Sequence, residues 1–147
     1  MRLVTLLALV VILLGCASFV FAEEVEPIAM NCRSIGGADL NTYTHGVEKG
    51  TGPNNIGLLI RTWGKVTKLD TTQKFFYIDD GSNRIDNSGF LGVRVSYNNL
   101  ADGVTIDPPA EQTYALVTGI SSTVMIDNKV QPNVLPRRDS DIQKFIL

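Results

Sequence analysis

From residue 57 onward, this 147-residue chain is built of short segments in which apolar and polar residues alternate, separated by turn-forming residues. Residues 58–67 are expected to form one long strand whose successive side chains point to opposite faces, with Gly64 placed to let the strand bend. Residues 74–78 form an aromatic, β-favouring segment. The other expected strands are 91–97, 112–120, 123–126 and 130–135. A period of two is typical of strands that bury one face. The sequence therefore predicts an all-β body.

The end of the chain carries two further signals. Residues 123–126 and 130–135 are expected to form a hairpin, and two prolines near its second arm favour an edge position, because proline cannot donate to a central ladder. The Asp-Ser-Asp sequence at 139–141 offers an N-cap, which predicts a short C-terminal helix over residues 142–147.

The amino terminus has the pattern of an export signal. Residues 1–22 are an almost unbroken apolar run that starts with a positive charge and precedes acidic Glu23. We interpret this run as a signal peptide cleaved after Ala22, which predicts a secreted, periplasmic or extracellular protein. Two alternatives stay open. The Leu-Leu-Gly-Cys motif ending at Cys16 resembles a bacterial lipobox, which would make a lipidated, membrane-anchored protein, and the run is also just long enough for an uncleaved anchor.

Removing the leader leaves about 125 residues, enough for one domain. Dropping Arg2 from the 13 Lys and Arg residues leaves 12 against 15 Asp and Glu, a net charge of −3. This balance argues against strong, charge-driven binding to nucleic acid or to an anionic membrane. Cys32 is then the single cysteine of the body, so no internal disulfide is expected, and it is interpreted as a small buried apolar residue.

The chain divides into three parts. The leader (1–22) is followed by residues 23–56, a polar, glycine-rich segment with scattered apolar anchors and no sustained period. This segment is interpreted either as an irregular wrap or cap, or as a flexible tether. Residues 57–147 form the β domain.

Five or so strands in about ninety residues fit a small closed Greek-key barrel better than a flat sandwich. The order of the segments also resembles the layout of OB-fold binding domains, including secreted bacterial ones, over residues 57–142. The sequences that carry this resemblance are Arg-Thr-Trp-Gly-Lys-Val at 61–66, Phe-Phe-Tyr-Ile-Asp-Asp-Gly-Ser at 75–82, Gly-Val-Arg-Val at 92–95 and Tyr-Ala-Leu-Val-Thr-Gly-Ile at 114–120. The resemblance implies a five-stranded OB-fold barrel over these residues. Residues 23–56 fall outside it and are expected to form a mostly irregular N-terminal extension.

Period-two alternation assigns the faces of the first three strands. The residues expected to point inward are Ile60, Val66, Phe76, Ile78, Val93 and Val95. The residues expected to point outward, as a cationic and aromatic ligand-binding face, are Arg61, Trp63, Lys65, Phe75, Tyr77 and Arg94. Aromatic rings stack on bases or sugars, and cations contact acidic groups. The alternative is that the 23–56 segment covers these aromatic residues through Ile28, Met30 or Leu40 and makes a second small core.

The acidic turn after the aromatic segment is a weak calcium candidate through Asp79, Asp80 and Asp86, although turns favour the same residue types. No Cys/His metal cluster, phosphate-binding glycine loop or nucleophile elbow is present, so no cofactor and no enzymatic activity are expected.

The sequence therefore favours a secreted, non-enzymatic binding module for an extended ligand: a single-stranded nucleic acid, a polysaccharide or a partner protein. The alternative is a structural subunit of an extracellular or cell-envelope assembly, such as a homo-oligomer. In it, the apolar face and the hairpin edge near residues 132–136 would contact other subunits, and residues 23–56 would dock onto a neighbour. A membrane association is expected only if Cys16 is lipidated or the leader is retained.

Overall fold

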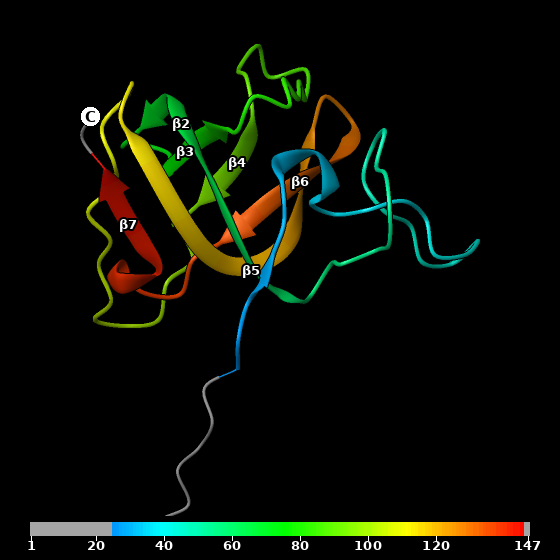
Figure 1. Cartoon of the computed structure of the whole chain (residues 1–147), viewed down its shortest axis with the longest axis horizontal. Helices are drawn as coiled ribbons and strands as arrows, with labels where there is room; N and C mark the ends of the chain where they lie inside the picture. Colours follow the sequence, from blue (N-terminus) through cyan, green and yellow to red (C-terminus); the bar gives the residue numbers. More distant parts are fainter. Residues whose placement is uncertain (1–24, 146–147) are drawn as a thin grey trace, which may run out of the picture.

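The computed structural model describes residues 25–145, so the leader, Cys16 and its alternative processing lie outside the described residues. The described chain is all-β, as the alternation predicted (Figure 1). Its strands are β1 (Ile28–Ala29), β2 (Leu59–Asp70), β3 (Phe75–Asp79), β4 (Val93–Ser96), β5 (Tyr114–Ile126), β6 (Lys129–Leu135) and β7 (Ile142–Phe145). Two single-turn 3-10 helices accompany them, η1 (Cys32–Ser34) and η2 (Asp139–Asp141). This part of the chain holds no helix with the length and apolarity of a membrane span.

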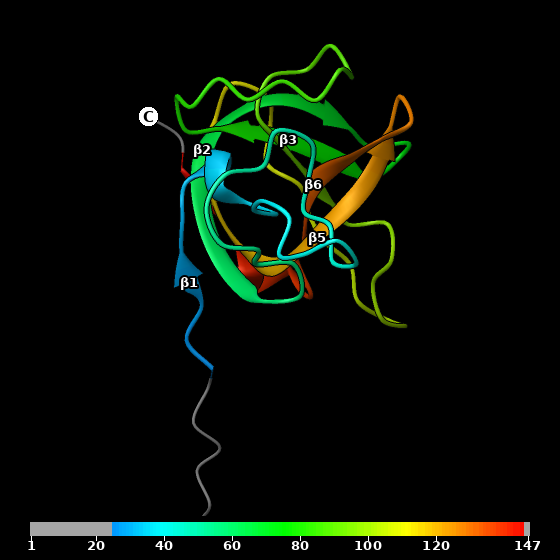
Figure 2. The ribbon, with the colours of Figure 1, turned by 90° about the vertical axis from the view of Figure 1, so that its right-hand side faces the viewer.

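The strands form one mixed sheet in the order β1-β2-β3-β4-β6-β5-β7. An additional antiparallel pairing of β2 with β5 joins β2, β3, β4, β6 and β5 into a ring, which Figure 2 views end-on. Within the ring only β4 and β6 are parallel; the other neighbours are antiparallel. The ring gives the sheet an enclosed inner face and a separate outer face.

Two of the expected strands are a single one. Residues 114–126 run without a break as β5, although the expectation divided them at Ser121 and Ser122. The first half of β5 pairs with β2, and its second half pairs with β6 (Figure 1). A side chain at Gly119 would collide with the backbone of Leu135, so glycine lets the strands approach closely where β5 passes from one partner to the other.

The expected edge position of the second hairpin arm is wrong. β6 lies inside the sheet between β5 and β4. Its pairing with β4 involves Asn133 and Val134, so Pro132 precedes the paired residues and its missing N–H removes no bond from that ladder.

The expected C-terminal helix is also wrong. Residues 142–145 form β7, antiparallel to the start of β5. The Asp141 carboxylate accepts hydrogen bonds from the backbone N–H and guanidinium of Arg137, which precedes it, and so does not cap a helix that follows. Ile142 pairs with Val117 at the edge of β5 and is buried there. This burial favours a strand over the helix that the Asp-Ser-Asp sequence predicted.

The inner face of the ring is the hydrophobic core, and its assignment from alternation is confirmed. The six residues expected to point inward are at most 1% exposed and belong to one cluster. The cluster also contains Cys32 and Ile35, which the segment before β2 inserts into one end of the ring.

A buried amide ties this cap to the ring. The Asn55 side chain accepts hydrogen bonds from the Gly36 N–H and the Ser121 hydroxyl, both at 2.8 Å, and donates to the Ser34 carbonyl at 2.7 Å. Figure 2 shows the N-terminal segment lying across the end of the ring. The N-terminal segment is therefore held on the ring through the apolar contacts of Cys32 and Ile35 and the hydrogen bonds of Asn55.

The Asn55→Ala substitution tests this tie. It leaves two donors and a carbonyl without partners in a buried place, so we expect the free energy of unfolding to fall by about 2 to 4 kcal/mol. Urea denaturation measures it, with Asn99→Ala on an exposed loop as the control. An Asn55→Ala protein as stable as the control would show that the cap contributes little to the fold.

Candidate functional site

The six residues expected to face outward do share one face of the sheet. Lys65 pairs with Asp79, and Tyr77 pairs with Arg94. A register shift between Val66 and Lys68 inserts one extra residue into β2, so that Lys68 rather than Thr67 pairs with Tyr77. The outer face nevertheless divides into a covered half over β3 and β4 and an open half over β2.

The covered half corrects the expectation for Phe75, Tyr77 and Arg94. Phe75 is only 4% exposed and Tyr77 is fully buried, because Phe90 lies over both, with ring centroids 6.5 Å and 5.4 Å away. The Arg94 guanidinium lies 3.8 Å from the centre of the Phe75 ring. These rings are packed against the protein itself and offer no open surface to a ligand.

The cover comes from the loop between β3 and β4, not from the N-terminal segment. The Tyr77 hydroxyl donates a hydrogen bond of 2.7 Å to Asp86 of that loop. Burial, followed by the hydrogen bond to Asp86, raises the pKa of Tyr77 to about 12, although a hydrogen bond with Ser88 acts in the opposite direction. Ile28 and Leu40 remain exposed, and Met30 packs against the core cluster of the ring. The signal that could have predicted this cover is Phe90, a single aromatic residue in a loop rich in serine, asparagine and glycine.

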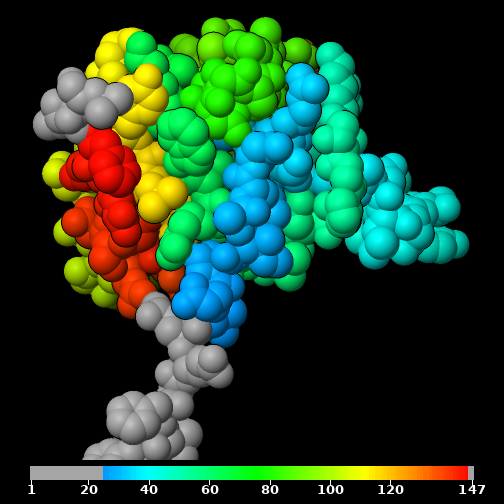
Figure 3. Space-filling view, viewed as in Figure 1, coloured from blue at the N-terminus to red at the C-terminus, as the bar shows by residue number. Residues whose placement is uncertain are grey.

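The open half lies over β2, β5 and β7. We call it the β2–β5–β7 face and define it by Arg61, Trp63, Lys65, Tyr114 and Phe145. Tyr114 pairs with Lys65 on one side and with Phe145 on the other, so the three residues form a row across three strands. Figure 3 shows the three strands side by side on one surface, with β7 in red, the start of β5 in yellow and β2 in green.

Trp63 dominates this face. Its side chain is 56% exposed, and its ring lies 6.4 Å from that of Tyr114 at an interplanar angle of 25°. Phe145 is 47% exposed. Exposed aromatic rings that cluster on one surface are typical of binding sites, because their burial by a partner is favourable. The Trp63 and Tyr114 rings therefore form a candidate stacking platform.

Two cations accompany the platform. Arg61 donates from Nε to the Thr118 hydroxyl at 3.1 Å, which fixes its direction along the sheet. Lys65 has no ion pair within residues 25–145. Tyr114 and Phe145 were not among the residues expected on this face. Alternation places Tyr114 on the outer face of its strand and could have found it, but Phe145 was assigned to a helix.

The calcium candidate is not assembled. The Asp79 carboxylate accepts the N–H groups of Gly81 and Asn83, and the Asp86 carboxylate is bound by Tyr77 and Ser88. Among the described residues, no three His, Cys, Asp or Glu side chains gather as a metal site. These carboxylates stabilise the turn and the loop instead.

Asp80 connects the turn to the cap. Its carboxylate accepts hydrogen bonds from the N–H groups of Cys32 at 2.8 Å and Ser82 at 3.0 Å. Partial burial acts to raise the pKa of Asp80, but these hydrogen bonds outweigh it and hold the pKa below the ordinary value of 3.8. The ionised carboxylate therefore stabilises the folded state.

The same interaction predicts a pH dependence. Because the folded pKa of Asp80 is lowered, its contribution is fully present above pH 3.8 and is lost as the pH falls through the folded pKa. We expect Asp80→Asn to lower stability at pH 7 by about 1 to 3 kcal/mol and to make the stability loss in acid less steep. Urea denaturation between pH 7 and pH 2 tests this, with Asp102→Asn on an exposed loop as the control. An acid slope identical in Asp80→Asn and the control would contradict it.

Cys32 and His45 lie apart from each other in different surroundings. The Cys32 thiol is buried at the cap, and burial, followed by repulsion from Asp80, raises its pKa to about 12. The imidazole of His45 lies 3.4 Å from Asp39, and both side chains face solvent. Neither residue belongs to the β2–β5–β7 face.

Comparison of the chain with protein-family models, with curated proteins and with solved structures found no match.

Proposed function

We propose that the protein is an exported, non-enzymatic binding module of the OB-fold type, and that it binds an extended polysaccharide on the β2–β5–β7 face. The fold assignment is supported by the ring order β2-β3-β4-β6-β5 and by the parallel pairing of β4 with β6. A five-stranded Greek-key barrel with these neighbours is the OB arrangement. Export is supported by the apolar leader of residues 1–22.

The position of the site departs from the usual one. In OB domains the second and third barrel strands carry the ligand face, and here these are β3 and β4. The β3–β4 loop covers that face with Phe90, so the Phe75 and Tyr77 rings are not accessible to a ligand there. The exposed ring of Trp63 beside Tyr114 carries the proposal for the neighbouring face.

The charge favours a polysaccharide over a single-stranded nucleic acid. Of the three cations expected on the outer face, Arg94 is engaged with the Phe75 ring, and Arg61 and Lys65 remain on the β2–β5–β7 face. The whole chain carries a net charge of −2. Nucleic-acid binding depends on several phosphate contacts, whereas a sugar ring stacks on an aromatic side chain without them.

Trp63 provides the test, because it is the single tryptophan of the chain. We expect its fluorescence to change saturably with a glucan hexasaccharide or polygalacturonate, and more weakly with oligo(dT). Trp63→Ala should weaken polysaccharide binding by about fivefold to 150-fold, the loss expected for a stacking contact of ~1 to 3 kcal/mol. Isothermal titration calorimetry measures the variants, with Met125→Ala, exposed at the far end of β5, as the control.

Equal affinity of Trp63→Ala and the unaltered protein would overturn the proposed site. Tight binding of oligo(dT) without polysaccharide binding would overturn the ligand class.

Assembly is the second candidate function, and the same aromatic face supports it. The hairpin arm that was expected to contact other subunits lies inside the sheet. The exposed Trp63 and Phe145 rings are therefore the surface through which copies of the chain would associate. Light scattering separates the two functions. A salt-resistant oligomer that Trp63→Ala dissociates would assign the face to a homo-oligomer rather than to a sugar.

A further inference from the structure

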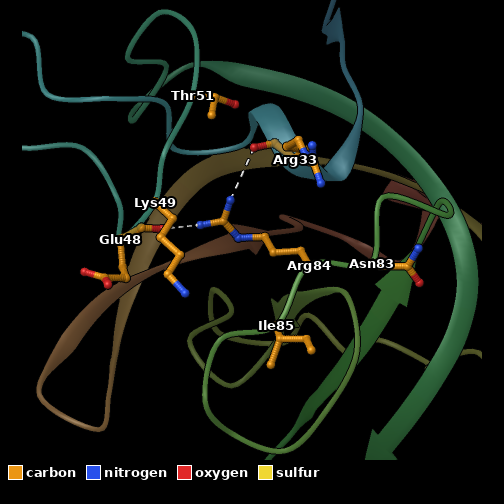
Figure 4. Close-up of a pocket in the computed structure, with 7 residues that line it drawn as sticks. All are labelled: Arg33, Glu48, Lys49, Thr51, Asn83, Arg84 and Ile85. Atoms are coloured by element: carbon orange, nitrogen blue, oxygen red, sulfur yellow. Dashed lines mark hydrogen bonds between the residues drawn. The ribbon is translucent and has the colours of Figure 1, made fainter.

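A cavity of about 370 Å³ lies between the cap and the β3–β4 loop, away from the β2–β5–β7 face (Figure 4). Three cations line it: Arg33 from η1, Lys49 from the cap and Arg84 from the β3–β4 loop. None of the three has a carboxylate within 4.0 Å in the described part of the chain. The cavity thus concentrates positive charge that the surrounding residues leave uncompensated.

Arg84 is held rigidly in the wall of this cavity. Its Nη1 donates to the backbone carbonyl of Arg33 at 3.2 Å, and its Nη2 donates to that of Glu48 at 2.8 Å. Its Nε is buried without a partner. Burial lowers the pKa of Arg84, although Asp86 acts to raise it. Among the described residues, the guanidinium therefore donates hydrogen bonds only to neutral carbonyl oxygens, and no carboxylate forms an ion pair with it at the cavity wall.

The single acidic residue of the lining does not neutralise the cations. The Glu48 carboxylate forms an ion pair with Lys129 at 3.1 Å. Figure 4 shows it pointing away from the guanidinium groups of Arg33 and Arg84. A negatively charged ligand would therefore be attracted to the cavity and would neutralise its three cations.

We propose that this cavity binds a small organic oxyanion, whose phosphate or carboxylate group is held by Arg33, Lys49 and Arg84. Guanidinium and ammonium groups form strong, charge-assisted hydrogen bonds with such oxygens. The volume is at the lower end of the range for small-molecule sites. The exposed side chain of Ile85 forms an apolar part of the wall, which suits the carbon frame of an organic anion better than a bare ion.

Two cations can be altered without breaking the wall. Arg84 joins the cap to the loop, so its removal would confound binding with folding. The Arg33 and Lys49 side chains are exposed, and the one hydrogen bond from the Arg33 guanidinium is a long contact of 3.4 Å to the Ser82 carbonyl. Arg33→Gln and Lys49→Gln are therefore the test variants, and Lys74→Gln on the exposed β2–β3 turn is the matched control.

The measurement is a nitrogen-15 NMR titration in low-salt buffer with phenyl phosphate, benzoate and inorganic phosphate. We expect the Lys49 amide and the Arg33 and Arg84 Nε–H signals to shift saturably with one or both organic anions, and less with inorganic phosphate. Each test variant should weaken binding about threefold to tenfold, the effect of removing one partly exposed charge. The phenyl phosphate and benzoate arms identify the preferred oxyanion, and the spectra also report whether each variant is folded.

Shifts that rise linearly without saturation, or an equal loss in Lys74→Gln, would overturn the site and indicate general attraction of anions. Stronger binding of inorganic phosphate than of phenyl phosphate would overturn the organic ligand. The two proposals fail separately. Trp63→Ala should keep the anion affinity, and Lys49→Gln should keep the polysaccharide affinity.

Discussion

The pairing of β2 with β5, from Leu59 to Lys65, is the constraint on which the rest of the structure depends. It converts a sheet with two edges into a ring, so that the alternation of each strand separates an enclosed core from an outer surface. Outside the ring, β1 pairs with the other edge of β2, and β7 pairs with the other edge of β5. A ring of this size still has open ends, and the N-terminal segment inserts Cys32 and Ile35 at one of them.

The outer surface is then divided by a single loop. The segment between β3 and β4 brings Phe90 over Phe75 and Tyr77 and holds Asp86 against the Tyr77 hydroxyl. Beyond that cover, β2 and β5 carry Trp63 and Tyr114 into solvent. The same loop supplies Arg84 to the cationic cavity, so the packing that covers one surface also builds the proposed anion site.

The alternation of apolar and polar residues was sufficient to identify the core residues, because every second side chain of a strand points to the same face of the sheet. Ile60, Phe76 and Val95 were placed correctly on that basis. What it could not establish is the environment of the opposite face. That depends on where a long loop folds back, as at Phe75 and Tyr77, and loops carry no period.

The local signals at the end of the chain were outweighed by tertiary contacts. The Asp-Ser-Asp sequence is a sound helix cap in isolation, but Asp141 binds Arg137 and Ile142 finds a buried place beside Val117. For the same reason Phe145 was missing from the expected face. Its position follows from the pairing of β7 with β5, which no local pattern indicated.

The central claim is that the chain covers the outer face of β3 and leaves the outer face of β2 open, with Trp63 at its centre. Acrylamide quenching of the intrinsic fluorescence tests it most directly, since one indole reports on one position. An accessible Trp63 predicts strong quenching and a red-shifted emission, close to those of N-acetyltryptophanamide. A blue-shifted emission that acrylamide barely quenches would place the indole inside the protein and contradict the claim.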